Sequence, residues 1–262
     1  MYDFQLLKPE TLTEAVAALA SGEAQALAGG QTLLPTMKQR LADPGTLVSL
    51  TAIAELQGVH QSDGCLVIGG ATTHAEVARA AKASFAALAA LAGQIGDPAV
   101  RNRGTIGGSL ANNDPSACYP AAVLGSGATI VTQAREIAAD DYFLGMFETA
   151  LGESEIITGV RFPLPLKAAY VKFAQPASRF ALVGAFVARF ENAVRVAITG
   201  ASNNGVFRWA AAEAALSADF TAEALDGHRL AADDMMSDLH GSADYRAHLA
   251  AVMLKRAVLA AV

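Results

Sequence analysis

The sequence predicts an α+β protein, and three observations support that fold class. Short apolar runs that suit strands alternate with helix-like stretches along most of the chain, and turn residues separate them. Two segments, Thr11 to Glu14 and Thr73 to Glu76, have the capping-box pattern that begins helices. The chain has 262 residues, which is the size of one large domain or two modest ones.

The first 50 residues predict a small β-α-β-α-β lobe. Pro9 stops a short initial strand, and Ser21 and Gly22 end the helix that the first capping box begins. Gly29 and Gly30 turn the chain from a second strand into a second helix. The predicted elements are strands at 4–7, 25–28 and 46–50 and helices at 11–20 and 31–40.

The next 110 residues or so predict a larger lobe. A hairpin at 56–69 has its turn at Ser62 to Gly64, a helical stretch runs from 73 to about 91, and strands follow at 128–133 and 156–162. Between these elements, residues 93–120 show no periodicity and are rich in glycine, asparagine, aspartate and proline. A loop of that length inside a compact domain is usually functional, so we expect part of a binding site here.

Pro163 and Pro165 mark the best candidate for a domain boundary. The remaining chain predicts strands at 170–173, 182–190 and 194–199 and helices at 209–216 and 243–261. We therefore expect one domain at 1–165, with lobes at about 1–55 and 56–165, and a C-terminal α+β domain at 166–262.

Composition and charge exclude several classes of protein. The net charge of −6 argues against a nucleic-acid partner, which would require a basic surface. The positive mean hydropathy of +0.32 reflects 58 alanines, and no charge-free run is apolar enough to span a bilayer. Because no secretory signal opens the chain, we expect a cytoplasmic protein, with peripheral association with the inner membrane face as an alternative.

Metal and cluster sites are also disfavoured. Cys65 and Cys118 are far apart, no CxxC pair occurs, and the five histidines form no HExxH motif. This excludes a four-thiolate iron–sulfur or zinc site within the chain. If the protein performs redox chemistry, its reactive centre must come from a cofactor or from a partner.

Two glycine-rich loops are the best candidates for a binding site. In Leu27 to Leu34 a strand is followed by Gly29, Gly30 and a helix, so a phosphate could approach the backbone; a plain tight turn explains the pattern equally well. The second loop, Arg101 to Ser109, combines two arginines, two hydroxyl side chains and three glycines, which favours an anion site over a solvated surface loop. Neither loop is a Rossmann or P-loop motif. Two such loops suit a ligand with two phosphates.

These residues resemble the medium subunit of molybdenum hydroxylases, the family of carbon monoxide dehydrogenase and xanthine dehydrogenase. Ala28 to Pro35, followed by Met37, Lys38 and Arg40, is similar to the first flavin loop of that family, and Ile95 to Ser109 is similar to the second. Further similar segments lie at 141–149, 155–157, 170–173, 242–246 and 255–257, so the resemblance covers nearly the whole chain.

The resemblance implies an FAD-binding fold of the vanillyl-alcohol-oxidase (PCMH) type, with a small βαβ lobe, a larger α+β lobe and a C-terminal α+β domain. Ile95 would lie near the flavin. Relatives commonly have aspartate at Cys118, which leaves open whether Asp114 compensates, and the segment after Lys172 is less basic than in relatives. The implied cofactor-binding residues are Ala28, Gly29, Gly30, Gln31, Thr32, Leu33, Ile95, Arg103, Thr105, Ile106, Gly107, Gly108, Ser109, Cys118, Ile156 and Lys172.

The function that follows from the resemblance is that of an oxidoreductase subunit without a catalytic acid, base or metal of its own. It would carry FAD and pass electrons from [2Fe-2S] clusters in a small subunit to an external acceptor. A large molybdopterin subunit would oxidise the substrate, and the complex would be a dimer of heterotrimers. The alternatives are a stand-alone flavin oxidoreductase of the same fold and a flavin-free maturation or scaffolding paralogue.

Overall fold

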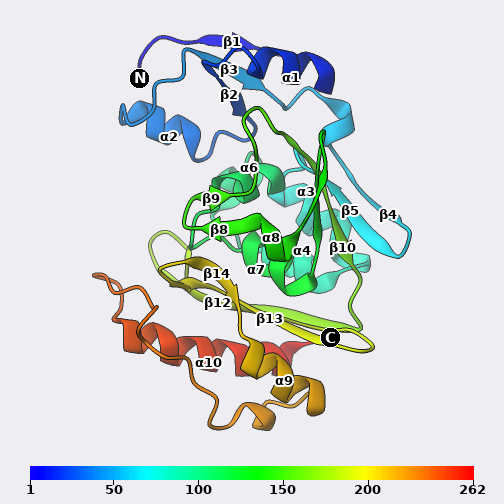
Figure 1. Ribbon diagram of the computed structural model, residues 1–262, viewed down its shortest axis with the longest axis vertical. Helices are drawn as coiled ribbons and strands as arrows, with labels where there is room; N and C mark the ends of the chain where they lie inside the picture. Colours follow the sequence, from blue (N-terminus) through cyan, green and yellow to red (C-terminus); the bar gives the residue numbers. More distant parts are fainter.

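The computed structural model describes residues 1–262 and stacks three units of secondary structure in chain order (Figure 1). The N-terminal unit is the predicted β-α-β-α-β lobe. Its parallel sheet has the order β1-β3-β2, with α1 and α2 as the connections. The elements are β1 (Gln5–Leu7), α1 (Leu12–Leu19), β2 (Ala24–Leu27), α2 (Leu33–Lys38) and β3 (Thr46–Ser49).

Both capping boxes begin helices, as predicted. The Thr11 hydroxyl accepts a hydrogen bond from the Glu14 amide at 3.2 Å, and the Thr73 hydroxyl accepts one from the Glu76 amide at 3.3 Å. The Glu14 carboxylate differs from the expected pattern, because it accepts from the amide of Glu10 rather than from that of Thr11. In each box the threonine hydroxyl nevertheless satisfies one amide that has no partner within the helix.

The middle unit contains an antiparallel sheet of order β4-β5-β10-β6-β7, with short helices packed against it. The predicted hairpin is present, and Asp63 and Gly64 form its turn with positive φ. The strands are β4 (Val59–Ser62), β5 (Cys65–Gly69), β6 (Thr129–Thr132), β7 (Glu136–Ala138) and β10 (Ile157–Pro163). The helices are α3 (His74–Ala80), α4 (Ala86–Gly93), α5 (Pro98–Arg101), α6 (Ile106–Asn112), α7 (Tyr119–Ser126) and α8 (Ala139–Tyr142).

Two predictions for this unit are wrong. The expected loop at 93–120 holds α5, α6 and the start of α7, and the expected helix at 73–91 is divided into α3 and α4. All eight residues of α7 are buried, so this helix has no polar face and no amphipathic period to detect. The division comes at Phe85, whose ring is buried between Phe162 and Phe186.

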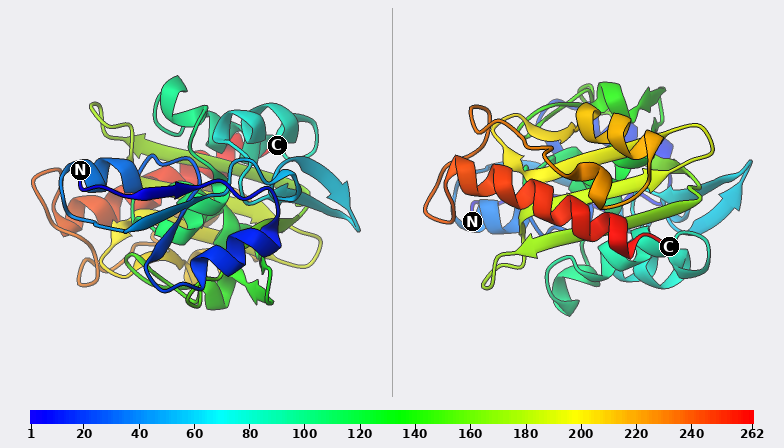
Figure 2. Two further views of the ribbon diagram at one scale, coloured as in Figure 1. Left: turned by 90° about the horizontal axis from the view of Figure 1, so that it is seen from above. Right: turned by 90° about the horizontal axis from the view of Figure 1, so that it is seen from below.

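The C-terminal unit is a four-stranded antiparallel sheet of order β11-β12-β13-β14. Figure 2 shows α9 and α10 crossing one face of this sheet, and α7 of the middle unit packs against β12 and β13. The elements are β11 (Lys167–Ala174), β12 (Ala181–Arg189), β13 (Val194–Ser202), β14 (Gly205–Arg208), α9 (Ala210–Ala218) and α10 (Ala243–Ala260).

Strand β12 joins the two largest cores, because its alternate side chains point to opposite faces. Phe186 and Ala188 belong to the core of the middle unit, whereas Ala185 and Val187 belong to the core under α9 and α10. The sheet after Pro165 is therefore packed on both sides. A small hairpin of β8 (Phe143–Gly145) and β9 (Glu148–Thr149) and three short 3₁₀ helices complete the chain. None of the helices has the length and apolar character needed to span a bilayer.

Candidate functional site

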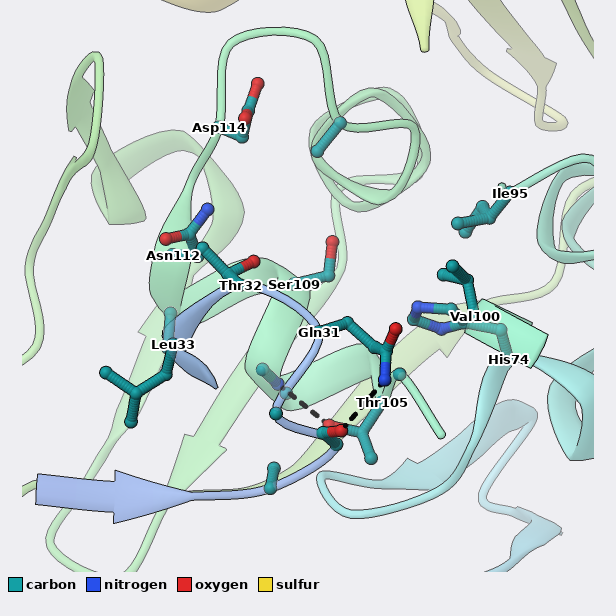
Figure 3. Close-up of a pocket in the computed structure, with 18 of the residues that line it drawn as sticks. Gln31, Thr32, Leu33, His74, Ile95, Val100, Thr105, Ser109, Asn112 and Asp114 are labelled. Atoms are coloured by element: carbon teal, nitrogen blue, oxygen red, sulfur yellow. Dashed lines mark hydrogen bonds between the residues drawn. The ribbon is translucent and has the colours of Figure 1, made fainter. Parts of the chain in front are cut away.

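A cavity of about 560 Å³ lies where the three units meet, which is within the usual size of a ligand site. Its walls come from the first glycine loop, from α6 and the segment that follows, and from β11 and the β11–β12 turn. Figure 3 shows Gln31, Thr32, Ser109 and Asp114 around this space. The predicted residues that line it are Ala28, Gly29, Gly30, Gln31, Thr32, Leu33, Ile95, Thr105, Gly107, Gly108, Ser109, Cys118, Ile156 and Lys172.

Two predicted residues, Arg103 and Ile106, do not line the cavity. Ile106 is the first residue of α6, and its side chain is fully buried in the core of the middle unit. Arg103 is exposed, and its backbone carbonyl faces Gly29. The second glycine loop lies at the cavity as predicted. Successive side chains around a helical turn point in different directions, so not every residue of the loop faces the cavity.

The first glycine loop has an unusual set of backbone amides. The amides of the five consecutive residues from Gly29 to Leu33 donate no hydrogen bond within the protein. Gly30 has φ +70°, a conformation that glycine adopts without strain. Successive unpaired amides in such a turn form a concave site for an anion. The expected phosphate site in this loop therefore has the donors it needs.

The second glycine loop differs from the expected anion nest. The amides of Ile106, Gly107, Gly108 and Ser109 all donate within the protein, to Thr72 O, Gly70 O, the Thr105 hydroxyl and Thr105 O. Arg101 also has protein partners, because one of its guanidinium nitrogens donates to the carbonyls of Ile95 and Gly96 at 3.0 Å. This loop presents the Ser109 hydroxyl and a bare helix surface at Gly108 to the cavity.

Some glycines in the loops are required for backbone packing. A Cβ on Gly29 would overlap the carbonyl oxygen of Arg103, and a Cβ on Gly107 would lie 2.6 Å from the carbonyl oxygen of Gly70. Both distances are shorter than any real contact, so these positions must be glycine. Gly108 is more open, with the Thr105 hydroxyl at 3.0 Å.

Ile95, Cys118 and Lys172 belong to the wall formed with the C-terminal unit. The Lys172 ammonium donates to the carbonyls of Gln94 at 2.9 Å and Arg179 at 2.7 Å, and it lies 3.5 Å from the Cys118 sulfur. Its three donors are therefore occupied within the protein. Beside Cys118, the Tyr170 hydroxyl is buried without a hydrogen-bond partner, and burial raises its pKa well above the usual value.

The ionisable lining residues that were not among the predicted contacts are His74, Asp114, Glu155 and Arg179; of these, the resemblance had raised only Asp114, as a residue that could compensate at Cys118. Burial raises the pKa of Asp114, whose carboxylate accepts from the Ser116 amide at 2.8 Å. The Arg135 guanidinium beside Glu155 lowers the pKa of that carboxyl to about 2. In the sequence, His74 stands at the start of a helix and Asp114 stands in a polar loop. Both patterns are too common to identify a site on their own.

Comparison with known proteins identifies the ligand of this arrangement. Residues 2–165 match the family described as the FAD-binding domain in molybdopterin dehydrogenase. The chain belongs to this family. It is 33% identical to the carbon monoxide dehydrogenase medium chain of Hydrogenophaga pseudoflava, covering 98% of this chain and 96% of the relative. It is 32% identical to the nicotine 6-hydroxylase medium subunit of Paenarthrobacter nicotinovorans, covering 97% and 95%.

The fold agrees with that assignment. The structure of carbon monoxide dehydrogenase from Hydrogenophaga pseudoflava superposes with a TM-score of 0.90 at 35% identity, covering 99% of this chain and 97% of the other. This confirms the predicted α+β fold and the prediction that the chain is the FAD-carrying medium subunit of a molybdenum hydroxylase. The residues present fit the cofactor, since the unpaired amides of Gly29 to Leu33 suit the two phosphates of FAD.

Proposed function

We propose that the cavity between the three units holds FAD, with the pyrophosphate at the amides of Gly29 to Leu33. The observation that carries this proposal is the run of five amides without a protein partner, in a loop that lines the cavity. Backbone amides left unpaired are costly unless water or a ligand satisfies them, and a pyrophosphate supplies several acceptor oxygens. The remaining predicted lining residues, from Ala28 to Lys172, would surround the rest of the cofactor.

Within the proposal, the bound flavin supplies the electron-accepting group and the chain supplies its environment. The first loop binds the phosphates, Gly108 permits close approach, and the Ser109 hydroxyl offers a hydrogen bond. Apolar residues such as Ile95 and Ile156 limit the water in the cavity. No residue of this chain is assigned as a catalytic acid or base.

The proposed role is transfer of electrons from the [2Fe-2S] clusters of a small subunit to an external acceptor. Substrate oxidation would take place in a large molybdopterin subunit, and two heterotrimers would form the complete enzyme. The names of the relatives support this arrangement, because they are called medium chains or medium subunits. In this chain, no three histidine, cysteine, aspartate or glutamate residues are grouped closely enough to hold a metal ion.

The proposed organisation also includes the domain boundary at Pro165 and a cytoplasmic location. The family match ends at residue 165, which supports a functional FAD domain at 1–165 followed by a C-terminal domain at 166–262. The two domains would nevertheless move as one body, since β12 contributes side chains to a core on each side. The location, free in the cytoplasm or at the inner face of the membrane, is part of the same proposal.

The test follows the flavin absorbance near 450 nm under anaerobic conditions. The isolated, FAD-loaded chain should be bleached by dithionite and should not react with carbon monoxide, xanthine, nicotine or aldehydes. Co-expression with the genes of both partner subunits should yield a complex in which one of these substrates reduces the flavin. Bleaching by a substrate without partners would instead show a stand-alone oxidoreductase, and a chain that binds no FAD would reject the proposal.

A further inference from the structure

The side chain of His74 has no assigned role although it lies in the wall of the cavity. His74 is the first residue of α3 and is only 5% exposed. Its amide donates to the carbonyl of Gly104 at 2.9 Å, which connects it to the second glycine loop. A Cβ on Gly104 would lie 2.5 Å from His74 Nε2, so the glycine at 104 makes room for the imidazole.

The imidazole has no hydrogen-bond partner within the protein. Nδ1 is buried and unpaired, and Nε2 has no hydrogen-bond partner in the protein either. Tyr119 packs against the ring at a centroid distance of 5.3 Å. Buried polar atoms in native proteins almost always have a partner, and a missing one costs about 1–3 kcal/mol. This cost falls on Nδ1, which stays enclosed, whereas Nε2 is not enclosed and is free to donate to a group in the cavity.

The two ring nitrogens differ in what they can reach. Nδ1 is fully enclosed, whereas Nε2 keeps accessible surface, and His74 is one of the residues that line the cavity. In the view of Figure 3 the ring points toward the side of the cavity that holds Gln31. Burial, and then the positive charge of Arg101, lower the pKa of His74 to about 4. The ring is neutral near pH 7 and has one N–H to donate.

We infer that His74 binds the FAD in this cavity, with Nε2–H donating a hydrogen bond to an oxygen of the cofactor. The inference rests on the proposed function, because it requires FAD in the cavity. The inference requires the Nε2–H tautomer, because Nδ1 is fully enclosed and cannot meet a group in the cavity. FAD offers phosphate, hydroxyl and carbonyl oxygens as acceptors. His74 is then a cofactor-binding residue on α3, an element outside both glycine loops.

Three substitutions separate a hydrogen bond from simple packing. His74→Phe keeps the ring shape without a donor, His74→Asn places an amide near the position of Nδ1, and His74→Gln places one near the position of Nε2. The apoprotein is titrated with FAD while flavin fluorescence is followed. We expect His74→Phe and His74→Asn to raise the Kd for FAD roughly tenfold, and His74→Gln to stay within about threefold of the unmodified protein. His248→Phe, on the exposed side of α10, is the matched control and should not change the Kd.

Stability and NMR provide independent measurements. The His74→Phe apoprotein should be as stable as the unmodified apoprotein or more so, because an unpaired polar group is replaced by an apolar one of similar shape. With ¹⁵N-labelled histidine, adding FAD should shift the Nε2 signal of His74 and leave that of His248 unchanged; this measurement does not depend on any variant folding.

Several outcomes would overturn the inference. A Kd for FAD that is unchanged in His74→Phe would do so, as would Kd values raised equally in His74→Gln and His74→Phe. So would an unchanged Kd in His74→Asn alone, or a His74 Nε2 signal that does not shift when FAD is added. Failure of the unmodified protein to bind FAD would be recognised separately, because it contradicts the proposed function itself.

Discussion

The two glycine loops have similar compositions and lie against each other, yet their backbone amides differ. From Gly29 to Leu33 the amides have no protein partner, whereas from Ile106 to Ser109 every amide donates within the protein. The first loop therefore offers its backbone to a ligand. The second loop offers side chains and an open surface, because its backbone amides are already hydrogen-bonded within the protein. A glycine-rich sequence predicts close backbone approach, but the approaching group can be a ligand or another part of the chain.

The same contrast has consequences for stability. Unpaired amides in the first loop must be solvated in the apoprotein, and they gain charge-assisted hydrogen bonds when a pyrophosphate binds. The second loop has these bonds already. FAD should therefore protect the first loop more than the second in hydrogen-exchange experiments, since exchange reports local opening.

The largest effect is expected where the loops touch. Gly29→Ala would place a Cβ on the carbonyl oxygen of Arg103, and the backbone cannot give way without separating the loops. We expect the free energy of unfolding to fall by about 3 kcal/mol and FAD to be lost. Urea denaturation and the flavin content per chain measure the two effects. Gly45→Ala is the matched control, because the nearest atom to its Cβ would be the Glu23 carboxylate at 3.7 Å. A stable, FAD-loaded Gly29→Ala protein would show that the loops do not need this contact.

A substitution at Gly108 tests the approach of the ligand without disturbing the packing of the backbone. Gly108→Val fills part of the cavity but meets only the Thr105 hydroxyl at 3.0 Å and the Ala28 Cβ at 3.7 Å. We expect a folded protein whose Kd for FAD is raised roughly a hundredfold, which is about 2.7 kcal/mol. Gly93→Val, at the exposed end of α4, provides the control, since only the Ala78 Cβ lies within 4.0 Å of the added atom. Full FAD occupancy in Gly108→Val would place the cofactor elsewhere.

The fold could be predicted from the sequence wherever a short sequence pattern was compatible with only one structural element. Capping boxes placed helices in the first lobe and the middle unit, the Asp63–Gly64 turn placed the hairpin of the middle unit, and apolar runs placed the strands of the C-terminal sheet. Helix α7 was missed because all eight of its residues are buried and it has no polar face, whereas α5 and α6, with four and seven residues, are too short to show a helical period. For the site, the loops were found from their glycines. The contrast between their amides and the unpaired imidazole of His74 depends on tertiary contacts at Gly70, Thr72 and Gly104, which no local pattern contains.

The part of the cavity wall around Glu155 depends on an ion pair rather than on glycine. The Glu155 side chain is 6% exposed and accepts hydrogen bonds from Arg135, from the Thr132 hydroxyl at 2.7 Å and from the Gly152 amide at 2.6 Å. Glu155→Gln should lower the free energy of unfolding by about 2 kcal/mol at pH 7. Glu153→Gln, at an exposed position nearby, is the control.

The pH dependence of the Glu155 effect has a definite sign. The hydrogen bond from Arg135 lowers the pKa of Glu155 to about 2 in the folded protein, below the usual value of 4.5. Its stabilisation is therefore complete above pH 4.5 and is lost as the pH falls toward 2. The stability difference between the unmodified protein and Glu155→Gln should shrink over that range. A difference that stays constant from pH 6 to pH 2 would contradict the lowered pKa.

The smallest effect is expected at Lys172, where the resemblance predicts a cofactor contact. Its ammonium already donates to Gln94 O and Arg179 O and lies beside the Cys118 sulfur, so no N–H remains for FAD. Lys172→Met should therefore lower the free energy of unfolding by about 1 kcal/mol, because it removes the hydrogen bonds to Gln94 O and Arg179 O, and should change the Kd for FAD by less than about threefold. Urea denaturation and FAD titration of the same preparation measure both quantities. A Kd raised more than tenfold with unchanged stability would instead make Lys172 a direct ligand of the cofactor, and the first loop would then share its role in holding FAD with β11.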